Sequence, residues 1–116
     1  MTHTLGYADE KTDALRAYAI YQVIFNESHL LNLAVHPQFQ GKGVGRDLLR
    51  ALMADSFKKG ALSIFLEVRP SNEAGRKLYE SHGFRCLMVR EKYYSNGEAA
   101  LILSADLPYE EKGTHH

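Results

Sequence analysis

Residues 31–46 read L-N-L-A-V-H-P-Q-F-Q-G-K-G-V-G-R. An apolar strand leads through a turn into a glycine-rich loop, and a helix is expected to begin directly after the loop. Gly41, Gly43 and Gly45 alternate with larger residues, so successive backbone N–H groups can converge on one point without obstruction by side chains. The stretch predicts an anion site, and a tight strand-to-helix turn that happens to be basic is the alternative.

Two cations and the start of the helix add to this loop. Lys42 and Arg46 supply donors for the oxygen atoms of a phosphate, and the first N–H groups of a helix carry the positive end of its dipole. The loop lacks the Gly-Lys-Ser/Thr of a P-loop, and its third glycine comes one residue too early for G-x-G-x-x-G. The expected ligand is therefore a phosphate or pyrophosphate, outside both of those nucleotide-binding motifs.

Length and composition restrict the class of protein. The 116 residues, 1–116, are expected to form a single domain, with a weakly defined start at 1–13 and a polar tail at 108–116. The 14 basic residues balance the 14 acidic ones, which gives no indication of a nucleic-acid or membrane surface. Neither a membrane span nor a secretion signal is recognisable, so a cytoplasmic location is expected. The single cysteine, Cys86, is expected to be a small core residue.

The rest of the chain alternates between strand and helix patterns. Strands are expected at 1–9, 15–25, 30–35, 62–68, 84–90 and 99–105, with turns at 9–13 and 26–28 and a hairpin signal at 95–97. The first three strands are expected to be antiparallel, and the strand–helix–strand–helix order that follows implies parallel neighbours joined by right-handed crossovers. The predicted fold class is mixed α/β (α+β).

The two helices are expected after the glycine loop and between Asn72 and Gly83. Five apolar side chains of the first helix repeat at helical spacing and are expected to face the core: Leu48, Leu49, Leu52, Met53 and Phe57. Gly60 is expected to end this helix in a left-handed conformation. The second helix is expected to begin at Ser71 or Asn72 and to end at Gly83.

The loop also resembles a family signature. Residues 40–45, Q-G-K-G-V-G, resemble the Q-x-x-G-x-G/A pyrophosphate loop of the GNAT-type N-acetyltransferases. Three later motifs follow in the order of that family: L-E-V-R-P-S-N at 66–72, L-Y-E-S-H-G-F at 78–84 and K-Y-Y at 92–94. They resemble the RimI branch, which acetylates the N-terminal alanine of proteins, over roughly residues 15–107. The resemblance implies a mostly antiparallel central sheet with a splayed parallel strand pair and flanking helices.

The resemblance implies acetyl-CoA as cofactor. The contacts that it implies at the pyrophosphate loop are Gln40, Gly41, Lys42, Gly43, Val44, Gly45 and Arg46. Leu33, Ala34 and Val35 would contribute main-chain groups, because a strand that splays from its parallel neighbour leaves N–H and C=O groups free to pair with the pantetheine and the acetyl oxygen. Asn72 is implied to contact the pantetheine or phosphate region, and an ordinary helix N-cap is the alternative, which can coexist with that role.

Acetyl transfer to an amine needs a proton acceptor for the amine and a proton donor for the departing thiolate. Glu67, at the end of a strand and beside apolar residues, is the predicted acceptor, and a solvated carboxylate paired with Arg69 is the alternative. Tyr79 is the proton donor that the L-Y-E-x-x-G-F match implies, and a core tyrosine beside Leu78 is the alternative.

The leading hypothesis is direct transfer of an acetyl group from acetyl-CoA to a primary amine, the N-terminal alanine of a (ribosomal) protein. Tyr93 and Tyr94 are expected to line the groove for the acceptor, against the alternative of an aromatic hairpin surface. No metal site is expected, because His29, His36 and His82 lack ligand spacing. Two other functions stay open: a small-molecule amine acetyltransferase, and a CoA-binding module without turnover.

One departure from the family concerns the start of the chain. Chains of the family normally open with a strand and two helices before the first hairpin, and those helices form part of the acceptor groove. Residues 1–25 do not contain them. Either the chain is a short or truncated form of the family, or a partner subunit supplies the missing surface. The sheet surface left uncovered predicts a homodimer or higher species that forms through the strands of the first or the final hairpin.

Overall fold

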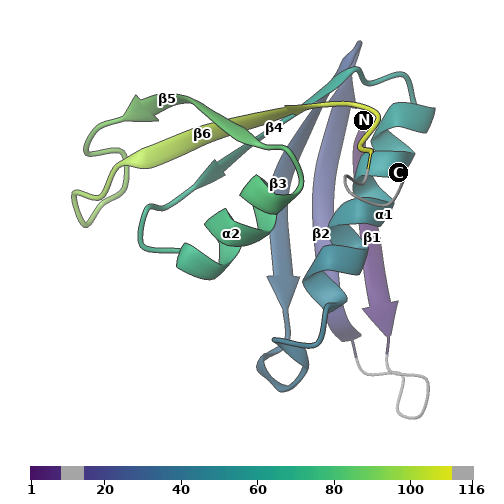
Figure 1. The fold of residues 1–116 in the computed structure, drawn as a ribbon, viewed down its shortest axis with the longest axis horizontal. Helices are drawn as coiled ribbons and strands as arrows, with labels where there is room; N and C mark the ends of the chain where they lie inside the picture. Colours follow the sequence, from purple (N-terminus) through teal and green to yellow (C-terminus); the bar gives the residue numbers. More distant parts are fainter. Residues whose placement is uncertain (9–14, 111–116) are drawn as a thin grey trace, which may run out of the picture.

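The computed structural model describes residues 1–8 and 15–110 (Figure 1). Within these residues lie one six-stranded sheet, in the order β1-β2-β3-β4-β6-β5, and two α-helices. The elements are β1 (Thr2–Ala8), β2 (Leu15–Ile24), β3 (Glu27–Val35), η1 (Pro37–Phe39), α1 (Val44–Lys58), β4 (Ser63–Val68), α2 (Glu73–Ser81), β5 (Arg85–Arg90) and β6 (Ala100–Asp106). Every neighbouring pair is antiparallel except β3 and β4. The mixed, mostly antiparallel fold class is confirmed.

The first three strands form the predicted antiparallel hairpins. The turn between β2 and β3 is tighter than the sequence indicated, because Ile24 pairs with Glu27 and β3 begins at Glu27. Phe25 has a φ of 54°, a left-handed conformation that two-residue hairpin turns use. The turn expected at 9–13 lies outside the described residues.

The parallel pairing of β3 with β4 is short. It runs from Glu27 to Leu30 on β3 and ends at Leu66 on β4. Beyond these positions β3 keeps its partners on β2, and β4 keeps its partners on β6. Leu31 is an extra residue in β3 at the register shift against β2, and such a bulge bends a strand. The predicted splayed pair is therefore confirmed, and its opening begins at Leu31.

The second crossover differs from the expectation. β4 and β5 are not neighbours, since β6 lies between them and is antiparallel to both. The reason is burial: β6 buries Ala100, Leu103 and Ala105, whereas every residue of β5 is exposed, which suits a strand at the edge. The prediction that Cys86 belongs to the core was wrong, because it lies on this exposed strand.

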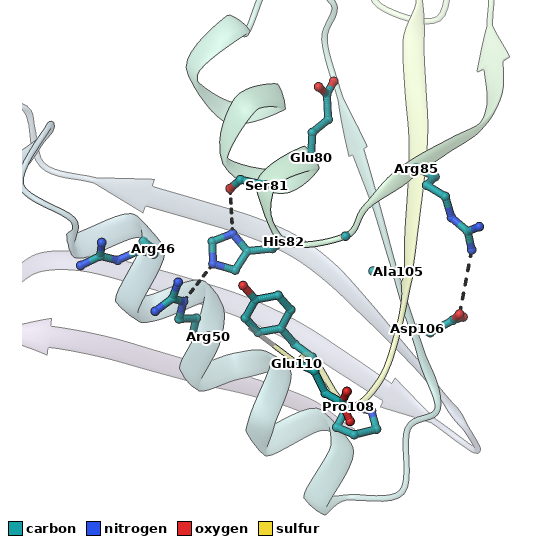
Figure 2. A pocket seen from close by; sticks show the side chains of 12 residues that line it. Arg46, Arg50, Glu80, Ser81, His82, Arg85, Ala105, Asp106, Pro108 and Glu110 are labelled. Carbon is teal, nitrogen blue, oxygen red and sulfur yellow. Dashed lines mark hydrogen bonds and ion pairs between the residues drawn. The ribbon is translucent and has the colours of Figure 1, made fainter. Parts of the chain in front are cut away.

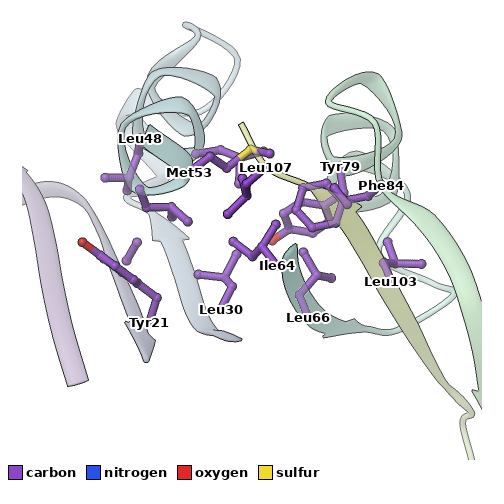
Figure 3. Close-up of a cluster of buried hydrophobic side chains, with 14 of the residues drawn as sticks. Tyr21, Leu30, Leu48, Met53, Ile64, Leu66, Tyr79, Phe84, Leu103 and Leu107 are labelled. Carbon is purple, nitrogen blue, oxygen red and sulfur yellow. The ribbon is translucent and has the colours of Figure 1, made fainter. Parts of the chain in front are cut away.

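Both helices cover one face of the sheet, and the core lies between them and the strands (Figure 3). From α1 the core receives four of the five predicted apolar side chains, Leu48, Leu49, Leu52 and Met53. Phe57 is 43% exposed instead, because Ser56 turns inward and its hydroxyl lies 2.7 Å from that of Ser28. No helix within the described ranges 1–8 and 15–110 is long and apolar enough to cross a membrane.

The opposite face of the sheet is partly apolar. Leu31 is 58% exposed, and the ring of Phe65 stacks on that of His29 with centroids 5.4 Å apart. Phe65 alternates along β4 with the buried residues Ile64 and Leu66, so it projects away from the helices. Neither α1 nor α2 covers this face (Figure 3).

Candidate functional site

The glycine-rich stretch leads from β3 and η1 into α1, as predicted, but α1 begins within it, so Gly45 and Arg46 lie in the first turn of the helix. Gly41 and Gly43 have φ values of 76° and 80°, in the left-handed region that favours glycine. Gly43 is the N-cap of α1, and no side chain caps the first turn there. The first N–H groups of α1 are therefore available to an anion.

The two predicted cations of the loop behave differently. The Arg46 side chain folds back over Gly43: a Cβ at Gly43 would lie 3.0 Å from a guanidinium nitrogen of Arg46. The Lys42 ammonium lies over the Phe39 ring, 5.9 Å from its centroid. Of the two, Arg46 is the one that lines the cavity beside the loop.

That cavity, of about 480 Å³, lies between the loop, the end of β3 and the start of α2. The predicted cofactor residues that line it are Leu33, Val35, Gln40, Gly41, Gly43, Gly45, Arg46 and Asn72, while Ala34, Lys42 and Val44 are outside its described lining. A Cβ at Gly45 would lie 3.5 Å from Val35 and 3.6 Å from Leu78, so a larger residue at this position would narrow the cavity. The Gln40 side chain donates a hydrogen bond to the Val35 carbonyl at 3.0 Å and so ties the loop to the strand end.

A second cavity, of about 220 Å³, occupies the gap where β3 and β4 diverge. It brings together Glu67, Asn72, Tyr79 and Tyr94, which the sequence had placed in three separate motifs. Asn72 and Tyr79 line both this cavity and the one beside the glycine loop. The two cavities therefore meet at the start of α2.

Glu67 projects from β4 with 39% of its side chain exposed, and its Oε1 lies 3.6 Å from a guanidinium nitrogen of Arg90. The alternative of a pair with Arg69 is wrong, because Arg69 pairs with Glu98 at 3.6 Å. Glu67 also lines a third cavity, of about 360 Å³, together with His29 and other residues of the uncovered face. Its carboxylate can thus be approached from the face opposite the helices.

Tyr79 is both a core residue and a residue of the candidate site. It is 8% exposed and meets the Phe84 ring edge-on, with centroids 5.6 Å apart, so it belongs to the core (Figure 3). It also lines the cavity that contains Glu67. Burial raises the pKa of the Tyr79 phenol above its ordinary value, so the hydroxyl keeps its proton at neutral pH.

Asn72 is the N-cap of α2, which confirms the alternative given for it. Its Oδ1 accepts a hydrogen bond from the backbone N–H of Gly75 at 2.9 Å. The side chain still lines both cavities, so the cap leaves a cofactor contact open.

The two tyrosines after β5 have different environments. Tyr94 lines the cavity with Glu67, and burial, together with the nearby Glu67 charge, raises the pKa of its phenol. Tyr93 is 48% exposed, packs edge-on against Tyr94 and lies beneath Arg90, whose guanidinium carbon is 5.7 Å from the ring centroid. Only Tyr94 of this pair lines one of the described cavities with a predicted catalytic residue.

Arg90, which sequence reasoning missed, reaches Glu67 because of the sheet order. β6 pairs with both neighbouring strands, so Glu67 lies opposite Ile102 and Arg90 lies opposite Ala100. This proximity depends on β6 lying between β4 and β5. No local signal at Arg90 could have indicated it.

The largest described cavity, of about 650 Å³, shares only Arg46 with the cavity beside the glycine loop (Figure 2). Arg50 Nε donates to Nε2 of His82 at 3.0 Å, and Ser81 Oγ lies 3.0 Å from Nδ1 of the same ring. Arg85 lies 3.9 Å from Asp106. These polar groups are matched to one another rather than directed at a ligand, and the cavity holds neither predicted catalytic residue.

Comparison with known proteins gives consistent results. Residues 2–84 match the Acetyltransferase (GNAT) family. The chain is 45% identical over 103 residues to the [ribosomal protein bS18]-alanine N-acetyltransferase of Escherichia coli strain K12, covering 87% of this chain and 70% of that protein. Identity to the enzyme of the same name from Salmonella typhimurium is 43% over 95 residues, covering 79% of this chain and 64% of that protein. The chain thus spans about two thirds of the length of these relatives.

Solved structures give the same fold. The crystal structure of the ribosomal-protein-S18-alanine N-acetyltransferase from Escherichia coli has a TM-score of 0.84 and 34% identity, covering 99% of this chain and 75% of that one. A chain of the NatC complex bound to Gag peptide and CoA has a TM-score of 0.85 at 22% identity, covering 90% of this chain and 71% of that one. By its sequence match, its fold and its pyrophosphate-loop motif, the chain belongs to the Acetyltransferase (GNAT) family.

Proposed function

We propose that this protein is a cytoplasmic acetyl-CoA-dependent N-acetyltransferase whose acceptor is the N-terminal alanine of a protein. The observation that carries the proposal is the gap between β3 and β4, where Glu67, Asn72 and Tyr79 line one cavity next to the glycine-rich loop. Two relatives that are more than 40% identical support this acceptor, because their names describe them as alanine N-acetyltransferases of a ribosomal protein.

The residues of the loop and of β3 fit CoA. The uncapped N–H groups of α1 and the Arg46 guanidinium suit a pyrophosphate, and the left-handed glycines leave the backbone accessible to it. Beyond Leu31, β3 has lost its parallel partner, so its main-chain groups can pair with amides of the pantetheine. When bound, acetyl-CoA would supply an activated acetyl thioester.

The acid–base roles follow from burial and exposure. Glu67, exposed toward the uncovered face, accepts a proton from the incoming ammonium, directly or through water. Arg90, which lines the cavity on the same uncovered face, pairs with this carboxylate at 3.6 Å. Tyr79, whose raised pKa keeps its hydroxyl protonated, donates a proton to the departing sulfur. An amine can thus attack the thioester directly, without an acetyl-enzyme.

The acceptor class is tested by mass spectrometry of acetyl transfer onto a panel of peptides and polyamines. Peptides that begin with alanine are expected to be acetylated fastest. Faster acetylation of polyamines would favour the small-molecule alternative. Binding of CoA without transfer to any member of the panel would favour the CoA-binding module and overturn the proposal.

Replacing Gly43 with valine is expected to weaken CoA binding while leaving the fold intact. A β-branched residue at φ 80° is strained by about 1–2 kcal/mol, and its Cβ would displace the Arg46 guanidinium from the loop. Isothermal titration calorimetry with CoA measures the effect, and pantetheine, which lacks the pyrophosphate, serves as the second ligand.

The matched control is Gly60→Val, at the other end of α1. Gly60 has a φ of 100° and no atom within 4 Å of its Cβ position, so this variant carries the backbone strain without touching the loop. CoA affinity should change in Gly43→Val alone. Equal affinities of the native protein for CoA and pantetheine would contradict a pyrophosphate site in the loop.

A homodimer is expected to form along the exposed edge of β5. Leu87, Met88 and Val89 are 60%, 52% and 49% exposed on this edge strand, and such an edge is available for pairing with a second copy. Light scattering at micromolar concentration should give the mass of a dimer, and Met88→Lys should give a folded monomer. A monodisperse monomer of the native chain would refute the dimer.

A further inference from the structure

The connection between β5 and β6, residues 91–99, is fastened to the start of α2 by the carboxylate of Glu98. Oε2 of Glu98 accepts a hydrogen bond from the backbone N–H of Ser71 at 2.9 Å. Oε1 lies 3.6 Å from a guanidinium nitrogen of Arg69, and only 20% of the Glu98 side chain is exposed. The backbone N–H of Glu98 donates to Oδ1 of Asn96 at 2.9 Å, which orders the residue from its own side of the connection.

Arg69 passes this restraint on to Tyr94. Its guanidinium carbon lies 4.0 Å from the centroid of the Tyr94 ring, a distance at which a cation and an aromatic face attract each other. The Tyr94 backbone N–H donates to the Glu98 carbonyl at 3.0 Å, so Tyr94 and Glu98 are also linked directly through the main chain. Tyr94 is thereby held where it lines the cavity with Glu67.

We propose that Glu98 is a positioning residue for the acceptor: through Arg69 it fixes the Tyr94 ring as the wall of the acceptor pocket beside Glu67. The proposal rests on the proposed function, because it assigns the Tyr94 side of the gap to the acceptor. A wall that is already ordered binds its ligand without a further loss of side-chain freedom. Glu98, Arg69 and Tyr94 lie outside the described lining of the cavity at the glycine loop, where the pyrophosphate would bind, so the restraint should affect the acceptor much more than acetyl-CoA.

The test compares Glu98→Ala and the milder Glu98→Gln with Glu91→Ala, a control on an exposed residue of the same connection. Steady-state kinetics use acetyl-CoA and a peptide that begins with alanine. Losing a charge-assisted hydrogen bond and an ion pair should raise the KM for the peptide roughly tenfold in Glu98→Ala, less in Glu98→Gln and not in Glu91→Ala. The KM for acetyl-CoA should change much less than the KM for the peptide in all three.

A second readout needs no substrate. Protons of the Arg69 side chain lie over the Tyr94 ring and should show ring-current shifts in the NMR spectrum of the free protein. These shifts should decrease in both Glu98 variants and persist in Glu91→Ala. Because the spectrum is recorded without turnover, it reports on the restraint even if the native protein acetylates no peptide, a result that would count against the proposed function instead.

Three results would overturn the positioning role. The first is ring-current shifts that persist in both Glu98 variants. The second is an unchanged KM for the peptide after the shifts are lost. The third is a parallel rise in the KM for acetyl-CoA, which would indicate general loosening of the fold.

Discussion

Replacing Glu67 with glutamine is expected to lower turnover at neutral pH by about two orders of magnitude. The amide keeps the shape of the side chain but cannot accept the proton of the incoming ammonium. Affinity for CoA should hardly change, because Glu67 lies outside the described lining of the cavity at the glycine loop. Steady-state rates across a range of pH, combined with calorimetry of CoA binding, measure both quantities.

Glu80→Gln provides the matched control, because Glu80 is an exposed carboxylate of α2 that lines neither cavity of the candidate site. It should retain native rates. If Glu67→Gln also turned over at the native rate across the whole pH range, Glu67 would be only the surface partner of Arg90.

Tyr79→Phe is expected to reduce turnover by a similar factor, about a hundredfold, without weakening acetyl-CoA binding. The substitution keeps the aromatic ring and its edge-on contact with Phe84, so the fold should be preserved. Because burial raises the pKa of the Tyr79 phenol above its ordinary value, any alkaline loss of rate from this group should come at a higher pH than the titration of a free phenol. The pH–rate profile and the binding isotherm together separate loss of the acid from loss of the cofactor site.

The control is Tyr7→Phe, which removes a hydroxyl from β1, an edge strand that is separated from β3 by β2. Native turnover by Tyr79→Phe would leave Tyr79 as a core residue, the role that its spacing beside Leu78 already suggests. An alkaline loss of rate in the native enzyme well below pH 10, absent from Tyr79→Phe, would contradict the raised pKa.

What the sequence could predict was mainly local. The left-handed conformation of Gly60, the N-terminal cap at Asn72 and most of the buried stripe of α1 depend on residues close in the chain, and the structure confirms them. The prediction that Phe57 is buried was wrong, because helical spacing alone does not show whether Ser56 or Phe57 completes the buried stripe. The splayed strand pair came from family resemblance rather than from any pattern in β3 or β4.

The contacts between the motifs could not be predicted in this way. Arg90 reaches Glu67, and Arg69 pairs with Glu98, only because β6 lies between β4 and β5 and carries the intervening connection back toward α2. Sequence order indicated a direct β4–β5 neighbourhood instead. Strand order is a property of how exposed and buried surfaces are distributed over the whole sheet.

In the proposed reaction an amine meets the acetyl thioester in the gap between β3 and β4. The most direct measurement is a crystal structure of the protein with a conjugate of CoA and a peptide that begins with alanine. We expect the pyrophosphate at the glycine loop, the linked peptide nitrogen within hydrogen-bond or one-water reach of Glu67, and the sulfur near Tyr79. A conjugate bound through the cavity at His82, or with its peptide away from Glu67, would contradict acetyl transfer in this gap.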